Sequence, residues 1–437
     1  MQFIKLRYHV FIVAFTIVVV SLSNCSGEKE EDNLILLASN TRALTEVKFE
    51  ASPERIKRGE YLTNSILKCF VCHSPRDTTN PGFPPINSKK GAGAVLWDTE
   101  KSRMVAPNIT PDKETGAGTW TDDMFARAIR EGIGHDGRAL SLPMYWTTYR
   151  ELSNEDLASV VVYLKTLKPV KNKLPKRRLS AEREKSLQGS SRPLTEAVKE
   201  QNLSDPLTRG RHFIRIADCL GCHTSWYKRN PGFFGGGNKL EKVYDTSFVF
   251  STNITPDATG LKGWTPELFI QVMRSGKAGV LDPVMPWVAY KNLSDEDLKG
   301  IFLALQELPP VQHKVINGIE STYCEVCDQE HGYGKYNKIQ PLTAKSFNKK
   351  LYPDFAGSYI HPDGFAIEVT LKKDTLMISE GGDPVELVHV GENRFQALGF
   401  STPVSFKRDE SGKVKWLISH WIGEDVFEKQ DSIKTGK

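Results

Sequence analysis

The chain has 437 residues, 39% of them hydrophobic and 25% charged, so its composition is that of a globular protein with two or three domains. Its formal net charge is only +5 at pH 7. A balance this close to neutral argues against nucleic acid as the main partner.

The first 24 residues have the pattern of an export signal. A basic start is followed by an apolar run at positions 10–20, too short to span a bilayer but suited to a signal-peptide core. The Leu-Ser-Asn-Cys that ends it resembles a bacterial lipobox, which implies that Cys25 carries lipid and anchors the chain on the periplasmic side of a membrane. The alternative is a plain secreted protein. Residues 25–50 are then expected to form a tether.

Two Cys-x-x-Cys-His runs follow, 150 positions apart. In an exported chain this motif is typical of c-type haem attachment, because the two thiols reach the vinyl groups of one porphyrin and the adjacent His reaches its iron. We therefore predict two covalently bound haems. Their attachment residues are Cys69, Cys72 and His73 for the first, and Cys219, Cys222 and His223 for the second.

The repeat extends well beyond the haem motif. Pro-Gly-Phe occurs at 81–83 and 231–233, and Asn-Ile-Thr-Pro-Asp at 108–112 and 253–257. Thr121 and Thr265 are predicted to cap helices that Gly132 and Gly276 end. Each unit closes with a longer match, at 143–157 and 284–298, in which two Ser-x-x-Asp capping boxes open the last helix: Ser153 with Asp156, and Ser294 with Asp297.

The sixth iron ligand should be a methionine that recurs in register. Met144 and Met285 do so, in loops before the last helix of each unit, and a thioether opposite His raises the reduction potential. Methionines without a counterpart are interpreted as packing residues: Met104, Met124 and Met273. His135 is the competitor for the first iron. Because no His matches it in the second copy, it is interpreted as a solvated loop residue.

Together these residues resemble the cytochrome c subunits of membrane-bound bacterial alcohol, gluconate and related dehydrogenases. The resemblance covers residues 51–312. It implies a class I cytochrome c fold for two all-α domains at 51–170 (the first unit) and 203–312 (the second unit), and electrons passed from a dehydrogenase towards quinone or an oxidase. The chain departs from that family in having two haem motifs rather than three and in having Tyr145, not proline, after Met144.

The family pattern also suggests that backbone carbonyls of the Pro-Gly-Phe turn accept the proximal His N–H. A simple turn with a core Phe is the equally weighted alternative. Residues 171–202 between the units are basic and polar, so they are interpreted as a solvated linker rather than a docking patch for an acidic partner.

Residues 313–344 are a connector with a third cysteine pair, Cys324 and Cys327. Asp328 stands where the haem motif has His, so a third haem is not expected. A disulfide is favoured because export exposes thiols to oxidation. The alternative is a zinc site formed by Cys324, Cys327 and His331 with His313.

Residues 345–437 alternate apolar and polar residues between turn signals, which predicts about seven short antiparallel strands in a small all-β barrel. The Phe-Ala-Gly-Ser-Tyr start at 355–359 loosely resembles a lipocalin-like domain. We expect a structural or protein-docking module there rather than a ligand-binding one.

The expected function is electron transfer without catalysis by the chain itself. The partners are a dehydrogenase or quinone-linked donor and a downstream redox acceptor. Two alternatives remain: a dihaem peroxidase, which needs an iron with an open or displaceable sixth site, and a partner-binding protein that acts through its β domain.

Overall fold

A computed structural model describes residues 36–430, with gaps at 142, 228–229, 243–246, 277–283, 340–341, 363–365, 380–383, 392, 398–402 and 421–423. The predicted signal peptide and Cys25 lie outside the described residues. Among the helices that are described, none combines the length and the apolar character needed to cross a membrane.

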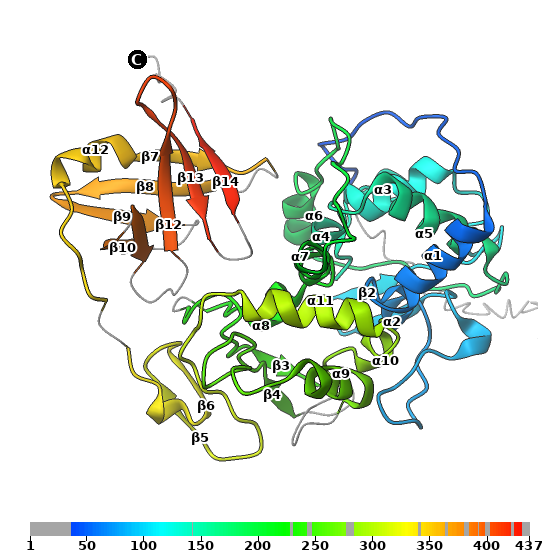
Figure 1. The fold of residues 1–437 in the computed structure, drawn as a ribbon. Coiled ribbons are helices and arrows are strands. Elements are labelled where there is room, and N and C mark those ends of the chain that lie inside the picture. The colour runs from blue at the N-terminus through cyan, green and yellow to red at the C-terminus, as the bar shows by residue number, and fades with distance from the viewer. Residues whose placement is uncertain are drawn as a thin grey trace, which may run out of the picture. The chain divides into compact units, whose positions relative to one another are not determined.

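The first unit contains five α-helices, the short 3₁₀ helix η1 (Asn87–Lys89) and one hairpin in its described residues (Figure 1). Its last helix, α5, carries a run of buried apolar residues and packs along α1. The hairpin means that the expectation of an all-α domain was incomplete. In chain order the elements are α1 (Pro53–Asn64), α2 (Cys69–Cys72), β1 (Ala94–Asp98), β2 (Arg103–Ala106), α3 (Asp122–Arg130), α4 (Trp146–Tyr149) and α5 (Asn154–Thr166).

The second unit repeats the order of the α-helices and strands, which supports the internal repeat found in the sequence. Helix α11 again packs along the first helix, α7. The elements are α7 (Pro206–Ile216), α8 (Cys219–His223), β3 (Lys239–Glu241), β4 (Phe248–Phe250), α9 (Pro266–Ser275), α10 (Trp287–Tyr290) and α11 (Asp295–Gln306).

A glycine lies where the first and last helices of each unit cross. A Cβ on Gly59 would overlap the carbonyl of Ser159 on α5 and lie 2.7 Å from Cβ of Tyr163. A Cβ on Gly210 would overlap the carbonyl of Gly300 on α11 in the same way. The absence of a side chain therefore allows the two backbones of each pair to pack directly.

The helix starts follow the sequence prediction. Thr121 and Thr265 cap α3 and α9, and Ser153 and Ser294 accept bonds from the N–H groups of Asp156 and Asp297. The capping boxes are only half formed, however. The Asp156 carboxylate pairs with Arg58 on α1 at 2.7 Å instead of turning back to the cap.

The two units share one buried apolar cluster, and polar groups also join them. The Tyr61 hydroxyl of α1 bonds the Asp297 carboxylate and accepts the N–H of Ser294 at 3.0 Å. The amide of Asn292 donates to the carbonyl of Asn64 at 2.9 Å. Because these bonds link the first helix of one unit to the last helix of the other, the units are directly packed against each other.

The segments flanking the first unit are held to it at a few points, although most of their described residues are exposed. The expectation of a solvated linker therefore misses these contacts. Before the unit, Arg42 bonds the buried carboxylates of Asp123 and Glu131. After it, α6 (Ala181–Gln188) places Glu184 2.7 Å from Arg177, with both side chains buried. A basic composition predicted solvation, but paired charges can be buried.

The connector forms a hairpin of β5 (Ser321–Cys324) and β6 (Gln329–Gly332), followed by the short η2 (Gly334–Tyr336). Cys324 and Cys327 are buried and not bonded to each other, so the expected disulfide is wrong. The physical reason is that both sulfurs face two buried imidazoles.

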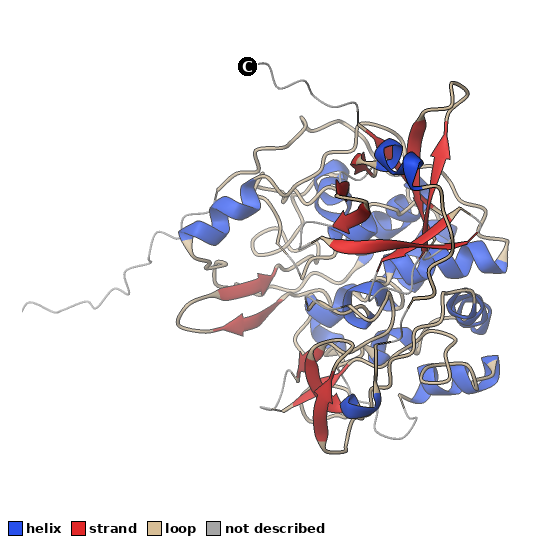
Figure 2. Ribbon diagram, turned by 90° about the vertical axis from the view of Figure 1, so that its left-hand side faces the viewer, coloured by secondary structure: helices blue, strands red, loops and turns tan. Residues whose placement is uncertain are grey.

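The C-terminal residues form a closed barrel of eight antiparallel strands in up-and-down order, which is one strand more than the sequence pattern suggested (Figure 2, strands in red). Strand β14 pairs with β7 to close it. Aromatic side chains fill the described interior, and Phe355 stacks on Phe406 at 4.4 Å between ring centroids. The elements are η3 (Lys349–Leu351), α12 (Tyr352–Phe355), β7 (Gly357–Ile360), β8 (Ala366–Lys372), β9 (Thr375–Ser379), β10 (Val385–Gly391), β11 (Arg394–Ala397), β12 (Pro403–Arg408), β13 (Val414–Ser419) and β14 (Asp425–Lys429).

Candidate haem sites

Each Cys-x-x-Cys-His run forms a single helical turn that begins at a residue with left-handed backbone. Lys68 precedes Cys69 with φ 47°, and Asp218 precedes Cys219 with φ 59°. One turn places the two cysteines of a run near each other and brings the following His to the end of the turn. All four sulfurs are free, so they are available for thioether bonds.

The imidazole of each run is held by a backbone carbonyl. His73 Nδ1 lies 2.8 Å from the carbonyl oxygen of Pro107, and His223 Nδ1 lies 2.7 Å from that of Thr252. A carbonyl can only accept, so Nδ1 carries the proton in both rings and Nε2 is left with a lone pair. This arrangement fixes the tautomer and the ring orientation that an iron ligand needs.

The carbonyls come from the residues before the two Asn-Ile-Thr repeats, not from the Pro-Gly-Phe turns, so the suggested role of those turns is wrong. In the first unit the turn instead bonds a side chain: Arg76 donates to the carbonyls of Phe83 and, at 2.8 Å, Val71. In the second unit Trp226 donates to Gly221 at 2.5 Å. Arg76 and Trp226 thus brace the haem-motif turn from the same position in each unit.

The asparagine after each of these carbonyls holds the loop in place. Asn108 is buried, accepts from the N–H of Thr110 at 3.0 Å and donates to the carbonyl of Val170 at 2.8 Å. Asn253 makes the equivalent bonds to Thr255 at 2.9 Å and to Val311 at 2.6 Å. Sequence reasoning found the repeated motif but missed this role. The signal was the recurrence of Asn-Ile-Thr-Pro-Asp in both units.

The first unit has a cleft beside its haem motif, with a cavity volume of about 130 Å³ and one side open to solvent. Most of its lining is apolar, so an iron complex there would be shielded from water. The residues that form it include Cys69, Cys72, His73, Ile109, Phe125, Ile129, Leu140, Met144, Tyr149, Val160 and Leu164.

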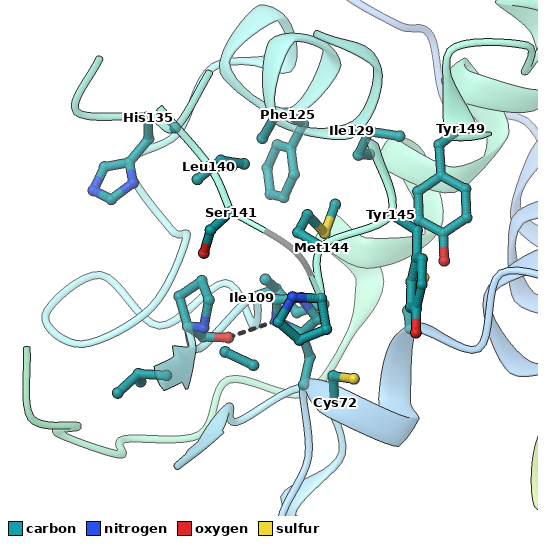
Figure 3. Close-up of a pocket in the computed structure, with 18 of the residues that line it drawn as sticks. Cys72, Ile109, Phe125, Ile129, His135, Leu140, Ser141, Met144, Tyr145 and Tyr149 are labelled. Atoms are coloured by element: carbon teal, nitrogen blue, oxygen red, sulfur yellow. Dashed lines mark hydrogen bonds between the residues drawn. The ribbon is translucent and has the colours of Figure 1, made fainter. Parts of the chain in front are cut away.

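Met144, which the sequence analysis predicts to be the sixth ligand of the first haem, lines this cleft. Figure 3 shows its thioether among the lining side chains, between Phe125 and Ile109. Met104 also lines the cleft, but its sulfur accepts a hydrogen bond from the Ser141 hydroxyl at 3.6 Å. In the second unit Met285 packs against the shared apolar cluster, next to the undescribed residues 277–283.

His135 is not the solvated residue that we expected. It is half-buried, lines the outer edge of the cleft (Figure 3) and stacks on Trp120 with 4.3 Å between ring centroids. Burial lowers its pKa below the usual value, which keeps the ring neutral at pH 7.

The short helix after each methionine is tied back to the haem-motif turn. Tyr149 donates its hydroxyl to the carbonyl of Leu67 at 2.6 Å, and Tyr290 donates to Ala217 at 3.0 Å. Leu67 and Ala217 lie two residues before the first cysteine of each run. The methionine loop and the attachment turn are therefore connected by one buried hydrogen bond per unit.

Lys68 connects the two haem motifs. Its side chain is buried, and its ammonium donates to the Ala217 carbonyl of the second unit at 2.7 Å while lying 4.4 Å from the Tyr145 ring. Burial lowers the pKa of this lysine. Asp218, which precedes the second motif, attracts the ammonium and partly offsets that effect. The Lys68 side chain therefore links the turn that carries Cys69 and Cys72 to the turn that carries Cys219 and Cys222.

The chemistry of the two runs fits haem better than a bare metal ion. In the described residues neither run belongs to a group of three or more His, Cys, Asp or Glu side chains able to share an ion. Burial raises the pKa of Cys69 and of Cys219 to about 12, so both stay neutral thiols rather than thiolate ligands. Free thiols, one imidazole with an open Nε2 and an apolar wall are what covalent haem requires.

The comparison with known proteins agrees with this geometry. Residues 56–168 match the cytochrome c family model, so this part of the chain is a cytochrome c domain. The chain resembles cytochrome c subunits of bacterial dehydrogenases. It is 27% identical over 297 residues to the fructose dehydrogenase cytochrome subunit of Gluconobacter japonicus, covering 63% of this chain and 57% of that protein. It is 31% identical over 292 residues to the gluconate 2-dehydrogenase cytochrome c subunit of Pantoea cypripedii, covering 59% and 60%.

A relative named diheme cytochrome c-type, from Cereibacter sphaeroides, is 25% identical over 269 residues, covering 56% of this chain and 83% of the relative. The alignments with the first two relatives are longer than the family match and span somewhat more than half of each relative's length.

Proposed function

We propose that this chain is a two-haem electron carrier in which both Cys-x-x-Cys-His runs bind haem covalently. The main support for the proposal is a hydrogen bond from the imidazole to a backbone carbonyl that occurs in both units. In both units the imidazole of the run donates its Nδ1–H to a backbone carbonyl, which leaves Nε2 available to iron. A methionine in register follows in each unit and serves as the second axial ligand.

A bound haem would supply reversible one-electron chemistry at its iron. The protein residues position and insulate it. His73 and His223 would bind the irons on one side, Met144 and Met285 would bind them on the other, and the cysteine pairs would hold the porphyrins. The apolar lining of the first cleft excludes water, which with thioether ligation favours a high reduction potential.

Electrons are proposed to pass between the two units inside this chain. The attachment turns are neighbours, since Lys68 beside the first cysteine pair bonds the Ala217 carbonyl beside the second. When protonated, Lys68 would place a positive charge between the sites and stabilise the reduced state of both irons. The bonds from Tyr61 and Asn292 keep the units packed together.

The donor is proposed to be a dehydrogenase or a quinone-linked protein, and the acceptor another redox protein. This rests on the relatives, whose names make them cytochrome subunits of fructose, alcohol and gluconate dehydrogenases. We further propose that the chain is exported to the periplasmic side of a bacterial membrane and anchored by lipid on Cys25. The eight-stranded barrel would serve as a structural or docking module, because aromatic residues fill its described interior.

The test is a potentiometric titration of the purified chain, followed by visible absorption and combined with mixing against hydrogen peroxide. We expect two one-electron steps per chain and no catalytic turnover of peroxide, because both irons have a methionine as sixth ligand. Rapid peroxide turnover by the unmodified protein would instead establish a dihaem peroxidase and overturn the proposal.

A further inference from the structure

Four metal-ligating side chains meet outside the haem units, in the connector. His313 follows the second unit, Cys324 ends strand β5, Cys327 lies in the hairpin turn and His331 lies on strand β6. All four have 0% exposure, and their ligating atoms lie within 4.8 Å of one another. In the described residues this is the one such group of three or more His, Cys, Asp or Glu side chains.

The hydrogen bonds of the two imidazoles leave a lone pair on each ring facing the other. His313 Nδ1 donates to the carbonyl of Gly235 at 2.7 Å, and His331 Nδ1 donates to that of Gly332 at 3.0 Å. In the neutral rings, Nε2 is then an acceptor on both sides, and the two Nε2 atoms are 3.1 Å apart. Two buried acceptors at that distance repel unless a proton or a cation lies between them.

Two of the six distances between ligating atoms are close to those of a tetrahedral zinc centre, and all four atoms lie within 4.8 Å of one another. With Zn–N of about 2.0–2.1 Å and Zn–S of about 2.3 Å, a tetrahedron places two nitrogens about 3.3 Å apart and a nitrogen and a sulfur about 3.6 Å apart. The structure has 3.1 Å between the Nε2 atoms and 3.6 Å from Cys324 Sγ to His313 Nε2. The sequence spacing, two residues between the cysteines and three before His331, is also short enough for one hairpin to supply three ligands.

We propose that His313, Cys324, Cys327 and His331 bind one zinc ion as a closed structural site. Two thiolates and two imidazoles are a donor set suited to zinc, whereas calcium and magnesium require oxygen ligands. Both cysteines give up their protons when the ion binds. Four protein ligands in a fully buried site leave no open position for a substrate, so the role is structural rather than catalytic.

The site fastens the connector to the loop behind the second haem motif. His313 bonds Gly235, and the N–H of the next residue, Gly236, donates to the carbonyl of His223 at 2.7 Å. The backbone of His313 also bonds Thr259 and Asn253, the asparagine after the carbonyl that orients the His223 ring. Zinc would therefore hold the β5–β6 hairpin against the support of the second proximal ligand.

Measurements on the unmodified protein test the proposed zinc site directly. Metal analysis of the purified, haem-loaded protein should give one zinc per chain, and X-ray absorption at the zinc edge should show two sulfur and two nitrogen neighbours. A 324–327 disulfide in non-reducing peptide maps with no zinc would overturn the proposal, as would a third, non-haem iron in place of zinc. Neither result would change the haem count, so this test is independent of the proposed function.

A matched pair of variants adds a second readout. Cys327→Ser with His331→Asn should lose the zinc while keeping both covalent haems, whereas His361→Gln in the barrel should keep the zinc. Zinc retained at full stoichiometry by the double variant would show that it binds elsewhere, and would contradict the assignment. If the double variant does not accumulate, the metal analysis of the native chain still gives the answer.

Discussion

Replacing Met144 by leucine should abolish the thioether-to-iron charge-transfer band of the first haem and lower its potential by on the order of 200 mV. Axial ligands set haem potentials over a range of about 0.8 V, so losing one soft ligand moves the potential through a sizeable part of it. Leucine keeps the apolar volume of the cleft, so packing changes little. Spectroelectrochemistry would measure both effects, and carbon monoxide should bind the iron once its sixth position is open.

Met104 offers a matched control, because it lines the same cleft and is buried. We expect Met104→Leu to keep the band and most of the potential, since its sulfur already accepts the Ser141 hydroxyl. The reverse pattern, with the band lost in Met104→Leu and kept in Met144→Leu, would make Met104 the ligand. Met285→Leu should affect the second haem alone.

The substitution Gly59→Ala should destabilise the first unit by about 3 kcal/mol or more. Alanine normally stabilises the interior of a helix by about 1 kcal/mol relative to glycine, so the predicted sign is the opposite of the helix propensity. The cause is overlap of the new methyl group with the carbonyl of Ser159, which forces α1 and α5 apart. Urea unfolding followed at the methionine–iron band would report the loss.

Gly263 provides the comparison for this prediction, because it is exposed and a Cβ there meets nothing within 4 Å. Gly263→Ala should change the free energy of unfolding by less than about 0.5 kcal/mol. A Gly59→Ala protein as stable as the unmodified one would mean that the helices do not cross as closely as described. Gly210→Ala tests the same contact in the second unit, where α7 meets α11.

Features with a short-range signal could be predicted from the sequence. The attachment residues follow from a five-residue motif, and Thr121 and Thr265 cap their helices because a cap depends on bonds within one turn. Alternation of apolar and polar residues indicated the barrel, although the strand number came out one short. The register of the two copies placed Met144 in the cleft wall.

Features that depend on distant backbone groups could not be predicted. The carbonyls of Pro107 and Thr252 accept the hydrogen bonds of the His73 and His223 rings. Every residue has a backbone carbonyl, so residue type does not reveal which carbonyl lies near an imidazole. That depends on the path of the loop. The oxidising conditions expected outside the cytoplasm favoured a disulfide between Cys324 and Cys327. In the structure the two cysteines are not bonded to each other and are buried beside His313 and His331. Likewise, Arg177 looked solvated by composition and is buried against Glu184.

The central claim is that both units, including the second one outside the family match at 56–168, carry covalent haem. Its most direct test is the intact mass of the exported, full-length protein after acid extraction, which removes haem that is not covalently bound. The account predicts a gain of two haem masses, with loss of one when Cys219 and Cys222 are changed to alanine. A gain of one haem, or of three, would contradict it.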